Sequence, residues 1–314
     1  MEDDSVTPAW HLSWHETQVQ GRPARYGEAG TGTPFIFLHG WGLSDQTYKR
    51  ALGRLAQLGI RVLAPSLPGF GGTPKLPRES FSLTGYARWV ADFAESVGVE
   101  GPWYLGGHSF GGGVAIMTAH DHSQDLQLLV LVNSIGGSVW KDPRRPGTDP
   151  RLLADRPLWD WGLHFPYDIA GPRRFRAVVP VIVRDAMRNF ARDPVGFARV
   201  GRLASEANLL PELDELRRRE LPVVVLWGDE DRVLPEASMR AMMEVLGGSP
   251  QVVPGRHGWL LEDPDRFGEV MTNVVEVAEA ARRAESRENT PSPTPPRPRG
   301  RDRERSGRIR RGRR

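Results

Sequence analysis

Short apolar runs alternate with amphipathic stretches along most of this chain, and that alternation restricts its fold more than any other feature. The run 34–38, Pro-Phe-Ile-Phe-Leu, has no polar side chain, which is typical of a strand buried on both faces of a sheet. Similar runs, and two more polar opening segments, complete the set of expected strands: 10–19, 24–27, 34–38, 61–65, 103–106, 128–132, 223–227 and 251–253.

Helix candidates lie between those runs. Over 83–97 the apolar residues recur at the spacing of one helix face. Asp263 followed by Pro264 predicts the start of a helix that continues to about residue 284, because Asp is a favoured N-cap and Pro a favoured first helical residue. Strands that alternate with helices of this length predict an α/β fold, with a mostly parallel central sheet flanked by helices.

Residues 138–206 interrupt the alternation. They lie between two expected core strands, contain no strong strand, and hold many Pro and Arg residues. We expect an inserted helical lid over the carboxyl edge of the sheet, which gives a core of 1–137 and 207–284, a lid of 138–206 and a disordered tail of 285–314. The aromatic residues of this segment either line an apolar pocket or form the lid's own core, and the sequence leaves both open. They are Trp140, Trp159, Trp161, Phe165, Tyr167, Phe175 and Phe190.

The strongest single motif is Gly-His-Ser-Phe-Gly at 107–111, which directly follows an expected strand and precedes a helix-like run. A serine at a sharp strand-to-helix turn adopts a strained backbone conformation, and Gly107 and Gly111 relieve the crowding two residues on either side of it. Ser109 is therefore the candidate nucleophile. An inert glycine-rich turn is the alternative.

The same turn directs the backbone amide of Phe110 into the site, at a helix N-terminus where partial positive charge accumulates. An oxyanion hole needs a second donor, and the His-Gly-Trp-Gly loop at 39–42 follows the strand 34–38. We assign the amide of Trp41 as that donor. His39 is interpreted as a structural residue that fixes the loop, and His108 as a packing residue whose side chain points away from that of Ser109.

Position along the chain selects a base from the eight histidines. His257 lies in the loop after the last short strand, which places it at the same sheet edge as Ser109. His120 and His122 lie at the far end of the helix that begins at Ser109. They could suggest a metal site, but no third ligand accompanies them in the sequence, and no metal is expected.

Three acidic residues compete to orient the imidazole of His257, a role that a carboxylate usually fills. Asp229, Glu230 and Asp231 all follow the strand 223–227. Asp231 is farthest into the loop and best able to reach a histidine that arrives from the next strand, so it is preferred over the other two. The strand that ends at residue 132 runs into Asn-Ser and supplies no competing acid.

In their chain order, Ser109, Asp231 and His257 resemble the catalytic residues of the α/β-hydrolase superfamily. Four segments match its pattern, at 38–41, 107–111, 228–231 and 256–259, and the turn 67–72 resembles a further family feature. The resemblance covers roughly 20–281. In the family the acid is the fourth residue of Gly-x-x-Asp, which supports Asp231. Ser66 departs from the pattern, since many members have Asp there. Dehalogenases and many epoxide hydrolases of this fold have Asp in the position of Ser109, so the serine argues against both activities.

These residues together predict a serine hydrolase that transfers an acyl group from an ester-like bond of a small, apolar substrate to water, with no cofactor. A carbon–carbon bond hydrolase of the same fold is one alternative. A non-catalytic small-molecule receptor built on a hydrolase scaffold is another, because fold alone does not determine function.

Composition adds expectations about location and partners. The chain has no cysteine, its start is acidic rather than signal-like, and no apolar run approaches the length of a membrane span, so we expect a cytoplasmic protein. Residues 282–314 hold thirteen arginines and four acids, a net charge of +9. Since the whole chain has a net charge of +3, the rest of the chain has a net charge of −6. The tail either binds polyanions weakly or is a solvated extension without a dedicated partner.

Overall fold

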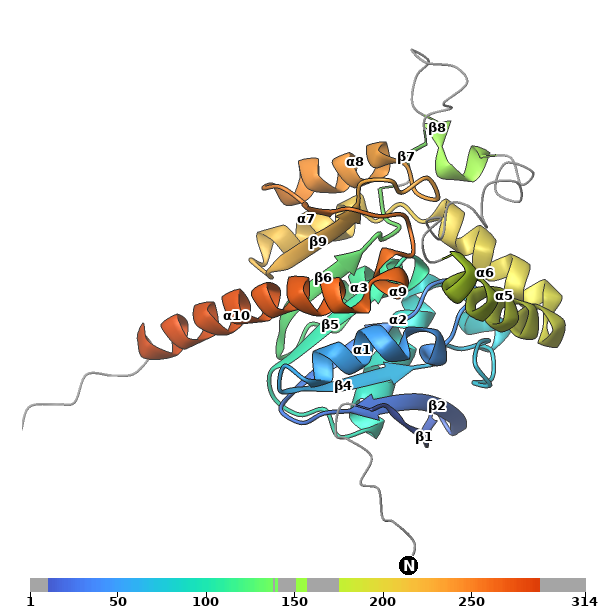
Figure 1. Ribbon diagram of the computed structural model, residues 1–314, viewed down its shortest axis with the longest axis horizontal. Coiled ribbons are helices and arrows are strands. Elements are labelled where there is room, and N and C mark those ends of the chain that lie inside the picture. The colour runs from blue at the N-terminus through green and yellow to red at the C-terminus, as the bar shows by residue number, and fades with distance from the viewer. Residues whose placement is uncertain (1–10, 138, 141–150, 157–174, 289–314) are drawn as a thin grey trace, which may run out of the picture. The chain divides into compact units, whose positions relative to one another are not determined.

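The computed structural model describes residues 11–137, 139–140, 151–156 and 175–288, and the sheet lies within them. Eight strands form it in the order β1-β2-β4-β3-β5-β6-β9-β10 (Figure 1). All eight expected strands are confirmed. Their bounds are β1 Ser13–Val19, β2 Arg22–Ala29, β3 Thr33–Leu38, β4 Ile60–Pro65, β5 Trp103–His108, β6 Leu126–Val132, β9 Val223–Gly228 and β10 Gln251–Val253.

The pairing is antiparallel only where β2 meets β1 and β4, and every other pair in this sheet is parallel. The central strand β5 is buried along its whole length, which explains why its sequence contains no alternation of polar and apolar residues. In register, Leu38 lies opposite Gly107, and Val132 lies opposite both His108 and Leu226. The carboxyl ends of β3, β5, β6 and β9 therefore meet at one edge of the sheet, which brings together the loops that follow them.

Helices cover this sheet, and both helices that the sequence indicated are present. The side chain of Ser82 caps the N-terminus of the first by accepting the N–H of Gly85. The second begins at Pro264 as expected and continues through Glu288, past residue 284, while the tail 289–314 lies outside the described residues. The helices outside the insertion are α1 Lys49–Ala56, α2 Leu83–Ser96, α3 Phe110–Asp121, α7 Leu210–Arg218, α8 Glu236–Leu246, α9 Trp259–Glu262 and α10 Pro264–Glu288. Short 3-10 turns η1 and η2 span Asp45–Tyr48 and Arg78–Ser80.

The described part of the insertion 138–206 is mostly helical. The two-residue strands β7 (Val139–Trp140) and β8 (Arg151–Leu152) pair antiparallel and lead into the 3-10 turn η3 (Leu153–Asp155). Helix α5 (Phe175–Arg192) then packs against α6 (Pro194–Glu206), as Figure 1 shows. Of the seven aromatic side chains singled out in this segment, only that of Phe190 belongs to the described part of the chain.

No helix among the described residues is both long enough and apolar enough to span a membrane.

Candidate active site

Ser109 lies at a strained turn between β5 and α3. Its backbone has φ 55° and ψ −119°, a conformation that side-chain-bearing residues rarely adopt. A Cβ on Gly107 would lie 2.3 Å from the backbone of Gly111, and one on Gly111 would lie 2.2 Å from the carbonyl oxygen of Leu38. Only glycine therefore fits at these two positions on either side of Ser109. The partly exposed serine lies at the carboxyl edge of the sheet.

The loop after β3 passes directly beside this serine. A Cβ on Gly40 would lie 3.3 Å from that of Ser109, so the loop backbone borders this serine. The N–H of Leu43 donates to the carbonyl of Gly40 at 3.2 Å and closes a turn in which Gly42 has φ +78°. Trp41 is the second residue of that turn. On the other side of the serine, the amide of Phe110 is the first of α3, and the first amides of a helix have no acceptor within it.

Asp231 and His257 are joined as the sequence predicts. Nδ1 of His257 and Oδ2 of Asp231 are 2.8 Å apart, and both side chains are buried. Oδ1 of the same carboxylate accepts the backbone N–H groups of Val233 and Leu234, each at 2.9 Å. These contacts fix the carboxylate in one orientation, with one oxygen directed at the imidazole.

The two competing acids lie elsewhere. Asp229 is exposed, and its Oδ1 accepts the backbone N–H of Gly255 at 2.9 Å. Glu230 is also exposed, and its Oε2 lies 3.5 Å from Nε of Arg256. The structure therefore brings Asp231, and neither of its neighbours, to the histidine.

Sequence reasoning missed Asn133, which follows β6 at the same sheet edge. This fully buried residue donates from Nδ2 to Oδ2 of Asp231 at 2.5 Å. Its Oδ1 accepts from Nε1 of Trp259 at 2.8 Å and from the N–H of Gly228 at 3.3 Å. We dismissed this position because it carries no acid. A polar residue directly after a buried strand, between the strands of Ser109 and Asp231, was the available signal.

His108 does more than pack, which corrects our interpretation. Nε2 lies 2.8 Å from the carbonyl oxygen of His257, and Nδ1 lies 2.7 Å from the hydroxyl of Tyr48. A carbonyl can only accept, so Nε2 carries the proton, and Nδ1 of the neutral ring accepts from Tyr48. Burial lowers the pKa of His108 well below its usual value, which keeps the ring neutral. The Tyr48 hydroxyl also accepts the N–H of Gly40 at 3.1 Å, so this chain of hydrogen bonds links the loop of Trp41 to the loop of His257.

Ser109 and His257 therefore lie on adjoining loops. The residue before Ser109 holds the backbone of His257, and the rings of His108 and His257 are 4.7 Å apart between centroids. The Ser109 hydroxyl makes no hydrogen bond to any described residue, His257 included. Contacts of this kind between nucleophile and base are often long in free enzymes and tighten when substrate binds.

Comparison with known proteins identifies the family. The model of the alpha/beta hydrolase family matches residues 35–270. The chain belongs to this family. It is 28% identical to a putative non-heme haloperoxidase of Mycobacterium phage D29, over 80% of this chain and 91% of the relative. It is also 28% identical to a pimeloyl-[acyl-carrier protein] methyl ester esterase of Aeromonas hydrophila, over 78% of this chain and 96% of the relative. A solved esterase from Thermogutta terrifontis shares the fold, with a TM-score of 0.65 at 23% identity, covering 85% of this chain and 99% of that one.

This alpha/beta hydrolase keeps a carboxyl group beside residue 66 although it has serine there. The hydroxyl of Ser66 donates to Oδ1 of Asp45, and both residues are buried. Burial raises the pKa of Asp45 to about 6. A Cβ on Gly71 would collide with the Ser66 hydroxyl, so the turn that follows β4 closes tightly over this pair. A carboxyl group therefore lies beside Ser66, supplied by Asp45 of a neighbouring loop.

His39 is structural, in agreement with our interpretation. Its Nε2 accepts the N–H of Leu67 at 2.9 Å, so Nδ1 carries the proton and donates to the carbonyl of Gly40 at 2.9 Å. Burial lowers the pKa of His39 to about 4, so the ring is neutral near pH 7.

Aromatic side chains of the insertion pack against the loop of Trp41. The ring of Phe197 on α6 lies 4.6 Å from that of Trp41 and 6.4 Å from that of Phe70, measured between centroids. Phe190 on α5 contacts Phe197 at 5.7 Å and is 44% exposed. Phe197 was not among the aromatic residues that the sequence analysis names, although it supplies one contact between the insertion and the candidate oxyanion loop.

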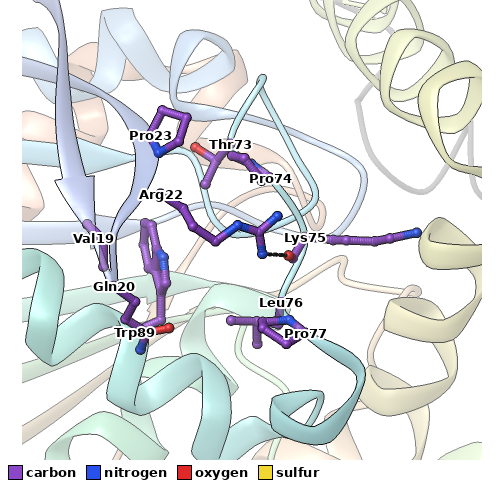
Figure 2. A pocket seen from close by; sticks show the side chains of 10 residues that line it. All are labelled: Val19, Gln20, Arg22, Pro23, Thr73, Pro74, Lys75, Leu76, Pro77 and Trp89. Carbon is purple, nitrogen blue, oxygen red and sulfur yellow. Dashed lines mark hydrogen bonds between the residues drawn. The ribbon is translucent and has the colours of Figure 1, made fainter.

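Figure 2 shows a small surface pocket outside this site. It lies between the β1–β2 turn, the 73–77 segment and Trp89 of α2, and Arg22 crosses it to donate to the carbonyl of Lys75 at 2.7 Å. None of its lining residues belongs to the site around Ser109. Within the described residues, no group of three or more His, Asp or Glu side chains could hold a metal ion.

Proposed function

We propose that this alpha/beta hydrolase is a serine hydrolase that cleaves an ester-like bond of a small, apolar substrate through an acyl-enzyme. The observation that carries the proposal is the buried His257–Asp231 pair, 2.8 Å apart, on loops that adjoin a serine held at φ 55°. A histidine oriented by a carboxylate next to a strained serine is the arrangement that acyl transfer requires.

Each proposed role follows from the position of the group. His257 removes the proton from Ser109, whose oxygen attacks the substrate carbonyl. The amides of Phe110 and Trp41 donate to the oxyanion of the tetrahedral intermediate. His257 then gives the proton to the leaving group, and the acyl-enzyme remains. Water repeats the sequence, releases the acid and regenerates Ser109, while Asp231 stabilises the imidazolium at each stage.

Aromatic side chains near the site support an apolar substrate. The rings of Trp41, Phe70 and Phe197 gather beside the loop that borders Ser109, which favours an apolar acyl or alcohol group. One relative is named as a methyl ester esterase. We propose that the insertion 138–206 acts as a lid over this region, because α5 and α6 contact the same loop.

A fluorophosphonate probe tests the nucleophile directly. We expect the purified protein to be labelled on Ser109 and the Ser109→Ala variant to remain unlabelled. Turnover of short p-nitrophenyl esters should accompany labelling and be lost with it. A wild-type protein that takes up no probe would favour a non-catalytic receptor on the same scaffold.

A second assay separates the two reaction types. An esterase should hydrolyse short p-nitrophenyl esters and leave vinylogous diketones intact. Preferential cleavage of the diketones would replace the proposal with carbon–carbon bond hydrolysis. A panel that also contains lactones would narrow the substrate further.

The basic tail is a separate question from catalysis. Weak polyanion binding predicts salt-sensitive retention on a polyanion column that disappears when residues 289–314 are removed, since helix α10 ends at 288. Retention that is unchanged by the deletion would leave the tail as a solvated extension.

A further inference from the structure

One helix of the insertion holds the loop of Trp41 through a buried amide. Asn189 of α5 is 1% exposed, and its Nδ2 donates to the carbonyls of Gly42 at 2.9 Å and Leu43 at 3.3 Å. Its Oδ1 accepts the N–H of Gly71 at 3.1 Å. Since a carbonyl only accepts and an N–H only donates, these partners fix the orientation of the amide. Every partner is a backbone group, so Asn189 constrains the path of the main chain beside the site.

Asp185, one helical turn earlier, holds the next part of the same loop. Its Oδ2 accepts the hydroxyl of Ser44 at 2.7 Å and that of Thr47 at 2.6 Å. Residues four positions apart lie on one face of a helix, so Asp185 and Asn189 act on the loop from the same side. The loop is thus fastened at several points between residues 42 and 47.

The fastened segment overlaps the turn 40–43, which contains Trp41. The turn is closed between Gly40 and Leu43, and its third residue, Gly42, has φ +78°. Asn189 binds two carbonyls of this turn: that of Gly42, inside the turn, and that of Leu43, the residue that ends it. A shift of either peptide plane rotates the neighbouring planes, and this would redirect the amide of Trp41 relative to Ser109.

We propose that Asn189 and Asp185 are positioning residues for the oxyanion hole, through which the inserted helix α5 sets the aim of the Trp41 amide. Catalysis then depends on the insertion for transition-state stabilisation as well as for substrate enclosure. The inference rests on the proposed function, because an amide at residue 41 affects turnover only if a tetrahedral oxyanion forms at Ser109.

The competing explanation is that these contacts only fasten the insertion to the core. The chain offers a control for that role, the ion pair between Nζ of Lys75 and Oδ2 of Asp193 at 2.7 Å. It ties the start of α6 to the 71–77 segment and includes no residue of the 40–47 loop. Lys75→Met therefore loosens the attachment of the insertion without touching the turn.

The test compares Asn189→Leu with Lys75→Met in the full-length protein, with p-nitrophenyl butyrate as substrate. For Asn189→Leu we expect kcat to fall about 10- to 100-fold with KM nearly unchanged, since loss of one oxyanion donor costs about 100- to 1,000-fold and a displaced donor costs less. A trifluoromethyl ketone, which adds to Ser109 and places an oxyanion in the hole, should lose affinity by the factor by which kcat/KM falls. Lys75→Met should leave all three quantities within about twofold of the wild type.

Circular dichroism and the melting temperature show whether Asn189→Leu folds. If it does not, a second pair of variants still tests the inference. Asp185→Asn keeps one acceptor oxygen for the Ser44 and Thr47 hydroxyls, whereas Asp185→Ala keeps none. We expect the alanine variant to lose more kcat than the asparagine variant, again at nearly constant KM.

The outcomes distinguish the inference from the proposed function. Folded variants of Asn189 and Asp185 that match Lys75→Met in kcat and in ketone affinity would overturn the inference, as would a rise in KM at constant kcat. Ester turnover that survives Ser109→Ala would instead overturn the proposed function.

Discussion

The two halves of the candidate site are held in different ways. In the acid–base half, the side-chain partners of Asp231 are Asn133, at the end of a core strand, and His257 itself. In the oxyanion half, the loop of Trp41 is held by Asn189 and Asp185, which belong to a helix of the insertion. In the proposed mechanism, proton transfer therefore depends mainly on the sheet edge, whereas oxyanion stabilisation depends on a helix from the segment between β6 and β9.

The division is not complete, because contacts cross it. Arg156, in the insertion, donates to the carbonyls of Arg232 and Val233 in the loop of Asp231. The Tyr48–His108 chain joins Gly40 to the backbone of His257. The comparison predicts that changes in one half leave the other half working, except at these links.

The largest effect is expected in the acid–base half. Asp231→Asn should lower kcat by about 10,000-fold, because the amide favours the wrong tautomer of His257 and cannot stabilise its imidazolium. Asp229→Asn is the matched control, since Asp229 lies on the same loop but binds the N–H of Gly255. Steady-state kinetics on a short ester measures both variants. Equal losses in the two would contradict the assignment of the acid.

Asn133→Leu should have the next largest effect. Loss of a residue that orients a functional side chain through a hydrogen bond lowers activity roughly 10- to 100-fold. This change removes the donor to Asp231 and the acceptor for Trp259. If the halves are independent, the effects of Asn133→Leu and Asn189→Leu should multiply in the double variant. A double variant no worse than Asn133→Leu alone would show instead that the halves act as one unit.

Tyr48→Phe tests the link between the halves. The change leaves Nδ1 of His108 and the N–H of Gly40 without their shared partner in a buried place. Each unpaired buried polar group costs about 1–3 kcal/mol, and because two are left here we expect the free energy of unfolding to fall by at least that amount. Urea unfolding followed by circular dichroism measures it. Activity should fall by a modest factor, in kcat and in ketone affinity together, because both loops lose support.

The smallest effect concerns pH and stability in the oxyanion half. Burial raises the pKa of Asp45 from 3.8 to about 6, so the folded state favours the protonated acid. This contribution is present below about pH 4 and is lost as pH rises through about 6. At about 1.4 kcal/mol per pKa unit it amounts to at most about 3 kcal/mol. Relative to wild type, Asp45→Asn should therefore gain stability between pH 4 and pH 7. His39 contributes in the opposite direction, because its lowered pKa makes stability rise as pH increases from about 4 to 6.5. This contribution is the same in both proteins, so it cancels in the difference between them. A difference that is constant across that range would refute the buried, protonated state of Asp45.

The fold and the contact between Asp231 and His257 were predictable from the sequence because each depends on local patterns. Apolar runs located the strands of the main sheet from β3 onward, and two more polar segments indicated β1 and β2. Strand order along the chain placed Ser109, Asp231 and His257 after strands whose carboxyl ends share one edge. The preference for Asp231 over Asp229 was also predictable, since a residue farther into the loop reaches farther from the end of the strand.

The supporting contacts were not predictable in this way. His108 carries the same local signature whether it packs or donates to the carbonyl of His257, a residue 149 positions away. Phe197 and Asn189 look like ordinary helix residues until α5 and α6 are placed against the loop of Trp41.

The sequence by itself determined which residues stand at the ends of the strands, because alternation and glycine spacing are properties of neighbours along the chain. Only the tertiary structure decided which buried polar groups satisfy one another. Such partners are chosen by proximity across segments, and a buried donor binds whichever acceptor the packing brings within about 3 Å. The hydrogen bond from Asn133 to Asp231 and the one from Asn189 to the turn of Trp41 are both pairings of that kind.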